Sequence, residues 1–316
     1  MPEGGSSIYT DADGYQAHVQ DILDLLVLQP RDFHAQLTWA DLCDLQLLRA
    51  KEASARVGYL TLPTDRVFVT FPAEQGSILN FGGVTLQFGD LMFHSRGEHR
   101  HQRTTAACEW ASIAVTPAAL SSFSRTLSGQ ELIAPTVGRV VRPRRADGRR
   151  LERLHAQVCH VVERSRNSIA NQEVVRALEQ DLFWVLISCL ADGKVQQDLP
   201  ESSQRLDVLS SLEALLAAQP FRLLKTHEIC SALAVSEATL RAKCSSTLGM
   251  SPSHYQRLRR LKLVRAELLQ SKSSTKGSIE EMILRCGFPN LHRFVAEYWR
   301  FYREMPPLRP VYPADG

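Results

Sequence analysis

The chain has 316 residues, of which 44% are hydrophobic and 22% are charged. At about 150 residues per domain this length predicts two domains, and the composition excludes a mainly disordered chain. The best candidate for a membrane span, residues 182–190, is about half the roughly 20 residues that a spanning helix requires, so no membrane partner is expected.

The amino-terminal residues 1–15 lack the basic and apolar regions of a secretory signal. The seven cysteines include no CxxC pair, which argues against a disulfide framework and against a cysteine zinc site. We therefore expect a cytoplasmic protein with reduced thiols and no cofactor.

Short β-rich segments cut by Gly and Pro occupy residues 33–115. Strands are predicted at 66–71, 77–81 and 84–88, and Gly82-Gly83 favours a two-residue hairpin turn between the last two. Several short strands at this spacing predict a small antiparallel barrel or sandwich.

After Pro117 the apolar residues change to helical spacing. Two amphipathic helices are predicted, which either cover the barrel or pair with the same helices of a second subunit. Residues 192–203 are polar and contain Gly and Pro, so a linker is expected there. The apolar stripes are Leu151, Leu154, Val158, Val161 and Val162, then Val174, Val175, Leu178, Leu182, Val185 and Leu186.

Charge is divided unevenly along the chain. Residues 220–316 carry 16 Lys and Arg against 8 Asp and Glu, whereas residues 1–219 carry 21 against 26. A basic module joined to an acidic one is the electrostatic footprint of a nucleic-acid-binding domain attached to another domain.

The carboxyl-terminal part also contains an internal repeat. Apolar helical segments at 226–233 and 279–285 are each followed by a tight turn. Ser236 and Asn290, 54 residues apart, then stand as N-cap residues of a second helix. Each copy therefore has the helix-turn-helix pattern. The i,i+4 pairs that would anchor the second helices are Leu240 with Cys244 and Phe294 with Tyr298.

Residues 205–310 resemble the DNA-binding domain of the AraC/XylS family of bacterial transcription regulators. The matching motifs follow the family's order and spacing around a joining helix predicted at 253–270. They are His227-Glu228-Ile229-Cys230 with 236–240, LGMSP at 248–252, Arg260-Leu261 with Val264-Arg265 and Leu268-Leu269, and RCGF at 285–288 with Asn290, Arg293-Phe294, Tyr298 and Pro306. The first half resembles the family's cupin-like effector-binding domain at 86–91, Gly97 and His99.

The second copy departs from the family pattern at three positions. Ile283 stands where the family usually has a small residue, Arg303 where it has Gly, and Met305 where it has Ser. The second copy is therefore expected to dock differently or to read fewer bases, unless the structure compensates. The first copy keeps Cys230, Gly249 and Ser251 at these places.

The resemblance implies that the second helix of each copy enters a DNA major groove, where outward side chains reach the bases. Arg241 would donate to guanine and Glu237 would accept from cytosine, although Arg241 contacting only phosphate or solvent is the alternative. Leu291 and Val295 would pack on thymine methyl groups or are ordinary exposed apolar residues. The predicted contacts are Glu237, Ala238, Arg241, Ala242 and Ser245, then Leu291, His292, Arg293, Val295 and Ala296. Lys243, Arg257, Arg293 and Arg300 bind phosphate or are solvated charges.

His94, His99 and His101 form a cluster in the first half. The upstream histidines of a metal cupin are missing, and three arginines within residues 96–103 would repel a cation, so no metal site is expected. The three histidines are instead candidates for binding an anionic effector at the mouth of the barrel.

Two further groups are expected to be structural. The seven arginines within residues 139–153 are predicted to form a solvated connector and helix start rather than to touch DNA or polymerase. Trp39, Trp110 and Trp184 are predicted to lie in the core rather than in a ligand cage.

The sequence thus predicts an α+β fold with a cupin-like β-barrel and an all-α domain of two helix-turn-helix units. Residues 1–195 would bind an effector and dimerise, β-rich to about 116 and helical after; 196–204 would form a linker and 205–310 would bind DNA. The expected partners are double-stranded DNA, a small-molecule effector, a second copy and RNA polymerase. The expected function is an effector-responsive activator and not an enzyme, since no catalytic motif is found. The alternatives are a cupin-type metalloenzyme with an accessory helical domain, and a constitutive DNA-binding repressor or architectural protein.

Overall fold

The computed structural model of the chain describes residues 3–164, 172–198, 208–270 and 276–307. The chain divides into two compact units: unit 1 is Met1–Leu28 with Asp32–Ser202, and unit 2 is Gln29–Arg31 with Ser203–Gly316. Of the linker predicted at 196–204, residues 196–198 belong to the last strand and 199–204 lie outside the described residues.

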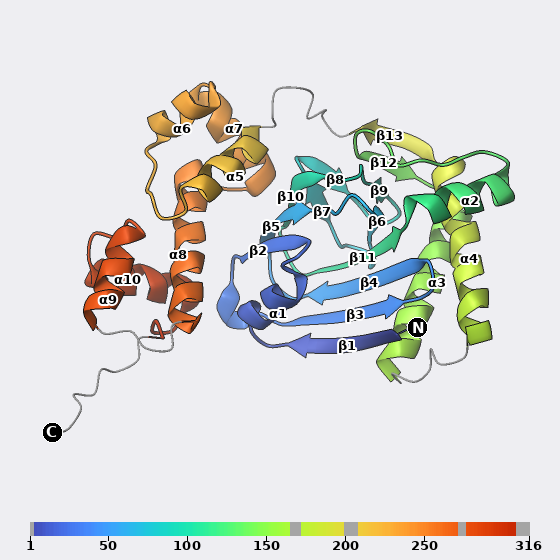
Figure 1. Cartoon of the computed structure of the whole chain (residues 1–316), viewed down its shortest axis with the longest axis horizontal. Coiled ribbons are helices and arrows are strands. Elements are labelled where there is room, and N and C mark those ends of the chain that lie inside the picture. The colour runs from blue at the N-terminus through green and yellow to red at the C-terminus, as the bar shows by residue number, and fades with distance from the viewer. Residues whose placement is uncertain (1–2, 165–171, 199–207, 271–275, 308–316) are drawn as a thin grey trace. The chain divides into compact units, whose positions relative to one another are not determined.

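Unit 1 contains two antiparallel sheets (Figure 1). The larger sheet has the strand order β1 (Glu3–Tyr9), β3 (Ala35–Asp41), β4 (Leu45–Glu52), β11 (Cys108–Val115), β6 (Val67–Pro72), β9 (Leu91–Phe93), β12 (Arg139–Arg142) and β13 (Lys194–Asp198). The smaller sheet has the order β2 (Leu23–Val27), β5 (Arg56–Thr61), β10 (His99–Thr104), β7 (Leu79–Phe81) and β8 (Val84–Leu86).

The predicted strands at 66–71, 77–81 and 84–88 correspond to β6, β7 and β8. The hairpin turn between β7 and β8 is also confirmed, because Gly82 and Gly83 both have positive φ angles, 57° and 94°, which only glycine adopts without steric cost.

The expected closed barrel is not what the structure shows. Within the described residues each sheet keeps two free edges, β1 and β13 in one and β2 and β8 in the other. Strands β1 and β2 precede the segments at 33–115 where strands were expected, and β12 and β13 occur in the part after residue 116 that was predicted to be helical. Here backbone pairing across long sequence separations outweighs the local composition on which the range was based.

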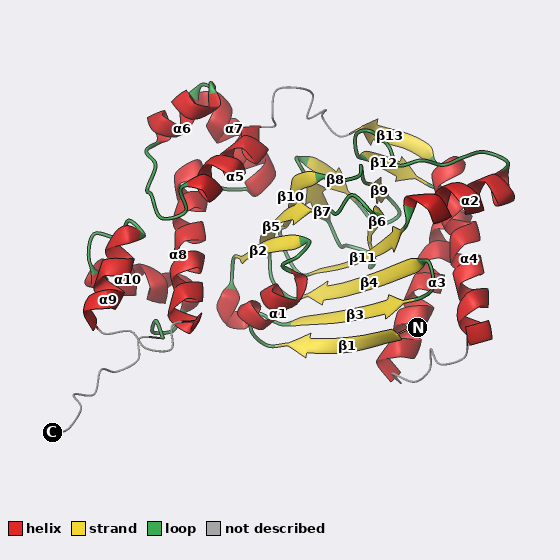
Figure 2. Ribbon diagram, in the orientation of Figure 1, coloured by secondary structure: helices red, strands yellow, loops and turns green. Residues whose placement is uncertain are grey.

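The described residues of unit 1 form four α-helices: α1 (Ala12–Val19), α2 (Pro117–Ser128), α3 (Arg145–Arg164) and α4 (Gln172–Ala191). Helices α3 and α4 occupy the two predicted amphipathic segments and lie beside the larger sheet (Figure 2). Leu151, Val158 and Leu186 share one buried cluster with the sheet residues Leu47 and Ile113. The two helices thus cover this sheet, while Val161 and Val174 remain 41% and 49% exposed.

Unit 2 is entirely helical in its described residues. It consists of α5 (Val208–Ala218), α6 (Thr226–Leu233), α7 (Glu237–Leu248), α8 (Pro252–Gln270), α9 (Lys276–Arg285) and α10 (Leu291–Tyr302). Helices α6 and α7 form one pair and α9 and α10 a second, with the long helix α8 between them in the chain.

Helix α8 is hydrogen-bonded to both pairs through side chains one turn apart. Gln256 accepts from the backbone N–H of Leu224 at 2.8 Å and donates to the Leu224 carbonyl at 3.1 Å. Arg260 donates to the carbonyl oxygens of Cys286 and Gly287 at 3.1 and 3.2 Å. These buried bonds fix the segments that begin α6 and end α9 to one helix.

Candidate functional site

Helix α7 exposes one face to solvent, made of polar residues and alanines. Ser236 caps the helix by accepting from the backbone N–H of Thr239 at 3.0 Å, and Leu240 and Cys244 are completely buried. With those residues inward, all five predicted base contacts are exposed, as is the phosphate candidate Lys243: Glu237, Ala238, Arg241, Ala242 and Ser245.

Arg241 is paired on this face rather than fully free. Its Nη2 lies 2.5 Å from Oε1 of Glu237, one turn earlier. Both side chains are more than half exposed, so the pair is worth little in water. Arg241 can therefore exchange Glu237 for a nucleic-acid acceptor at small cost.

Helix α10 has a similar but less polar outward face. Asn290 caps it by accepting from the backbone N–H of Arg293 at 2.8 Å, and Phe294 and Tyr298 are completely buried. His292, Arg293, Ala296 and the phosphate candidate Arg300 are exposed. Leu291 and Val295 are only half exposed, so they are less available to thymine methyl groups than predicted.

The phosphate candidate Arg257 lies on α8, not on either second helix. Its Nε is 3.7 Å from Oε2 of Glu297 on α10. Sequence reasoning missed Trp299, which is 49% exposed on α10 and carries the Arg303 guanidinium 5.2 Å from its ring centroid.

The three unusual positions of the second copy have three different environments. Ile283 is completely buried, so its larger side chain is part of the core. Arg303 takes the place of glycine at the end of α10 with φ 56°, in the left-handed region, and its N–H donates to the Trp299 carbonyl. Met305 is 65% exposed and needs no compensation.

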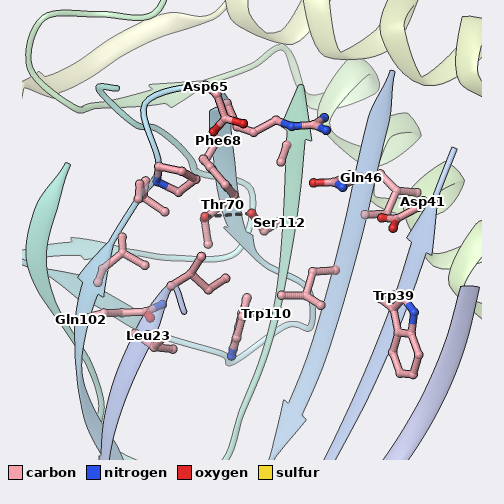
Figure 3. A pocket seen from close by; sticks show the side chains of 18 of the residues that line it. Leu23, Trp39, Asp41, Gln46, Asp65, Phe68, Thr70, Gln102, Trp110 and Ser112 are labelled. Atoms are coloured by element: carbon pink, nitrogen blue, oxygen red, sulfur yellow. Dashed lines mark hydrogen bonds between the residues drawn. The ribbon is translucent and has the colours of Figure 1, made fainter. Parts of the chain in front are cut away.

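A cavity of about 490 Å³ lies between the strands of unit 1 (Figure 3). Sequence reasoning did not find it, because its walls come from strands of both sheets. Its lining is Ile22, Leu23, Trp39, Asp41, Gln46, Leu47, Leu48, Leu60, Leu62, Pro63, Asp65, Arg66, Phe68, Thr70, Phe81, Gln102, Trp110, Ser112 and Ala114.

Two hydroxyl groups meet on the wall of this cavity. Thr70 Oγ1 donates to Ser112 Oγ at 3.4 Å, and a dashed line marks this hydrogen bond in Figure 3. Behind them, His94 Nε2 lies 3.1 Å from the same Thr70 oxygen. His94 was a candidate from the sequence. In the structure it does not line the cavity but contacts Thr70, which does.

The histidine cluster does not line this cavity. His94 and His101 are each 1% exposed, and none of the three histidines is among the lining residues. On β10 it is Gln102 that faces the cavity, so by strand alternation His101 and His99 face the other side, where the Tyr59 ring lies 5.0 Å from that of His101. In the described part of the chain, no group of three or more His, Cys, Asp or Glu is placed to hold a metal ion.

A buried carboxylate beside His94 remains ionised. Glu98 Oε2 lies 3.4 Å from His94 Nδ1, and Oε1 lies 3.2 Å from Arg100 Nε. Burial alone raises the pKa of Glu98, but His94, Arg100 and the Ser95 N–H outweigh it and lower that pKa to about 2.

A second buried charge group backs the opposite part of the wall. Arg56 Nε donates to Glu52 Oε2 at 2.7 Å and its Nη1 donates to Oε1 of Gln102, a lining residue, at 3.1 Å. The same Glu52 accepts from the Tyr15 hydroxyl at 2.6 Å. The guanidinium also lies 5.8 Å from the ring centroid of Trp110.

The tryptophan predictions have a mixed outcome. Trp110 is buried, at 4% exposed, but it also lines the cavity, as does Trp39. Trp184 is 43% exposed, so its placement in the core was wrong. It lies at the surface of α4, where the Arg150 guanidinium is 4.7 Å from its ring centroid.

Several of the arginines within 139–153 pair with acidic groups of unit 1. Arg142 Nε donates to Asp90 at 2.8 Å, Arg144 lies 3.3 Å from Asp192 and Arg139 lies 3.4 Å from Asp198. These contacts agree with a structural role for the segment.

One family model and two curated relatives match the chain. The family model, described as a helix-turn-helix domain, matches residues 229–307. The HTH-type transcriptional activator RhaR of Klebsiella pneumoniae is 28% identical over 146 residues, which are 46% of this chain and 50% of the relative. RhaR of an Enterobacter strain is 25% identical over 134 residues, 42% and 46% of the two chains. The chain spans about half the length of the curated relatives it matches.

Solved structures of similar proteins were also found. The AraC-like transcriptional activator CuxR is 15% identical with a TM-score of 0.39, covering 83% of this chain and 95% of that one. A regulator with an AraC-type DNA-binding domain from Chromobacterium violaceum is 28% identical with a TM-score of 0.29, covering 31% and 85%. In the described part of the present chain, no helix has both the length and the apolar character needed to cross a membrane.

Proposed function

The chain carries a DNA-binding domain of the AraC/XylS family of transcription regulators, and from this premise we propose that the whole protein is a cytoplasmic, effector-responsive activator. The observation that carries the proposal is the exposed face of α7, where five predicted base contacts surround a buried Leu240 and Cys244. Because the curated relatives are named as transcription activators, the metalloenzyme alternative is not proposed.

We propose that unit 2 contains two helix-turn-helix motifs, α6–α7 and α9–α10. Two features support this: both second helices are capped by a short polar side chain, and both bury one i,i+4 pair. Under this proposal α7 and α10 enter major-groove segments about 34 Å apart along the duplex. The more apolar face of α10 makes fewer base contacts than that of α7.

For unit 1 we propose a cupin-like effector domain. Its support is the cavity of about 490 Å³, which lies within the usual range of small-molecule sites, roughly 300–1,000 Å³. An effector that binds there acts by favouring one of two arrangements with different DNA affinity. A second copy would pair through α3 and α4, where Val161, Val174 and Trp184 are exposed, and RNA polymerase would be the partner in activation.

The test is selection of fragmented genomic DNA of the source organism by the purified full-length protein, at about 150 mM salt to suppress nonspecific binding. We expect a shared motif with two elements about 10 base pairs apart. The variant Arg241→Ala should alter the motif, whereas Lys51→Ala, which removes an exposed charge of unit 1, should leave it unchanged. Recovery of no preferred sequence would contradict the proposal.

Effector dependence separates the activator from a constitutive DNA-binding protein. The same selection is repeated with cell extracts depleted of macromolecules, as a source of candidate effectors. Effector control is supported if the extract changes the enrichment of the motif by the wild-type protein. The Leu48→Trp variant, whose cavity is narrowed, should then show no such change. Enrichment that is identical in every condition favours the repressor or architectural alternative.

A further inference from the structure

We propose that the buried end of the unit 1 cavity takes an uncharged, largely apolar part of a small molecule, with an oxygen atom placed at the Thr70–Ser112 hydroxyl pair. This inference rests on the proposed function only in identifying that molecule as the effector.

The charged residues on the cavity wall are not buried. Asp41 and Arg66 are half-buried and Asp65 is exposed, and in Figure 3 Asp65 lies toward the opposite end from Gln102 and Trp110. The lining residues that are buried are all uncharged, the polar ones being Thr70, Gln102 and Ser112. The buried part of the cavity wall therefore presents no charged side chain to a ligand.

The charges behind the wall are paired with opposite charges, although Nη2 of Arg56 has no hydrogen-bond partner among the described residues. Arg56 is paired with Glu52 at 2.7 Å, and Glu98 lies between His94 and Arg100. A carboxylate or an ammonium group at the buried end would thus have to compete with an existing partner. Burial of a charge without its own partner is unfavourable, whereas burial of an apolar group is favourable.

The same wall retains hydrogen-bonding capacity for a neutral oxygen. A hydroxyl group has one donor and two acceptor positions, and the Thr70–Ser112 contact is long at 3.4 Å. The indole N–H of Trp110 is buried and has no hydrogen-bond partner among the described residues. A carbonyl or hydroxyl oxygen of a ligand would supply acceptors for these donors, which a pure hydrocarbon would not.

A matched pair of fluorescent probes tests the charge requirement in the full-length protein. N-phenyl-1-naphthylamine is uncharged, and 8-anilino-1-naphthalenesulfonate differs from it by one sulfonate group. We expect the uncharged probe to bind with one site per chain, at least about tenfold more tightly than the sulfonate. Failure of the uncharged probe to bind, or equal affinity for the sulfonate, would overturn the proposal.

Two variants show whether the probe occupies the cavity. Leu48→Trp places a large side chain on a half-buried lining position and should weaken binding of the uncharged probe about tenfold or more. Ile8→Trp changes a strand residue that is 67% exposed and does not line the cavity, so it should bind as wild type does. Equal binding by both variants would place the probe elsewhere and overturn the assignment.

The oxygen requirement is tested with an uncharged naphthalene ketone, 6-propionyl-2-dimethylaminonaphthalene, whose emission shifts to longer wavelength when its carbonyl accepts a hydrogen bond. We expect Ser112→Ala, and more strongly Ser112→Ala with Thr70→Val, to remove this shift and weaken binding about threefold to tenfold. The single variant guards against unfolding of the double variant. An unchanged emission and affinity in Ser112→Ala would refute the role of the hydroxyl pair. None of these measurements involves DNA, so their failure is distinct from failure of the genomic selection.

Discussion

Ser236 and Asn290 begin α7 and α10 with the same hydrogen bond, although they lie 54 residues apart in the chain. In each case the side-chain oxygen accepts from the backbone N–H three residues later, at 3.0 Å from Thr239 and 2.8 Å from Arg293. The first turn of a helix has free N–H groups, and a short polar side chain satisfies one of them. The two second helices are therefore started by equivalent local chemistry.

We predict that Ser236→Ala and Asn290→Ala each lower the free energy of unfolding of the full chain's helical unit by about 1 kcal/mol. Each substitution removes the hydrogen bond that caps the helix, and both side chains are exposed, so no buried contact is lost. Urea denaturation followed by circular dichroism measures the change. Ser245→Ala, an exposed position inside α7, is the control and should be neutral or slightly stabilising.

Arg303 and Ala234 are the two non-glycine residues with positive φ among the described residues, at 56° and 52°. Both end a helix in the left-handed conformation, which costs a residue with a Cβ atom about 1–2 kcal/mol. We therefore predict that Arg303→Gly stabilises the chain by up to about 1 kcal/mol. The control is Arg303→Ala, which keeps the strain of a positive φ at residue 303 but loses the contact with Trp299. Comparison of the two variants separates relief of the strain from loss of that contact. A glycine variant that is less stable than the alanine variant would contradict the prediction.

Arg241 is predicted to read a base rather than a phosphate. Arg241→Ala should weaken binding to the selected DNA site by about 1–3 kcal/mol and relax the preference at one base pair. Lys243→Ala, also exposed on α7, should weaken binding to all sequences alike. Competition binding against a set of single-base variants of the site distinguishes the two, and an equal loss on every sequence would demote Arg241 to a phosphate contact.

His155 is predicted to make stability depend on pH. Its side chain is completely buried on α3, and burial first, with Arg49 second, lowers the pKa of His155 to about 4. Below pH 6.5 the unfolded chain binds a proton that the folded chain does not, so stability falls as pH decreases from 6.5 to 4, by about 3 kcal/mol from this group. Urea unfolding across this range should show a smaller fall for His155→Leu, even though that variant is less stable at neutral pH.

Thr70 and Ser112 are predicted to differ in their effect on stability. Thr70→Val leaves the buried His94 Nε2, now 3.1 Å from the Thr70 hydroxyl, without its partner, which costs about 1–3 kcal/mol. Ser112→Ala removes one end of a 3.4 Å contact and should cost less. Thermal unfolding of the two variants tests this order, and an equally large loss for Ser112→Ala would show that the hydroxyl pair matters more than the His94 contact.

The helical unit could be predicted from sequence because its signals are local. The caps at Ser236 and Asn290, the inward pair Leu240 and Cys244, and the bounds of α6 all follow from spacing within a few residues, and the structure has them where expected. Leu291 and Val295 were less well predicted, because exposure on α10 also depends on packing against residues distant in sequence.

The cavity could not be predicted in the same way. Leu23, Gln46, Thr70, Gln102 and Ser112 lie on five different strands, and only the pairing of those strands brings them together. The histidines nearby in the sequence did not point to the cavity wall itself, since alternation along β10 turns His101 away from the cavity when Gln102 faces it.

The bonds of Gln256 and Arg260 have a consequence for the DNA rather than for the protein. The segments that precede α6 and follow α9 are hydrogen-bonded to one continuous helix, α8, at positions a single turn apart. We therefore expect α8, and not a flexible linker, to fix the distance between α7 and α10. Under the proposal that both helices bind DNA, a straight duplex whose groove spacing does not match this distance has to bend. Smooth bending of a site of 20–30 base pairs costs about 1–6 kcal/mol and depends on sequence, so base pairs between the two contacted elements would influence affinity without being touched.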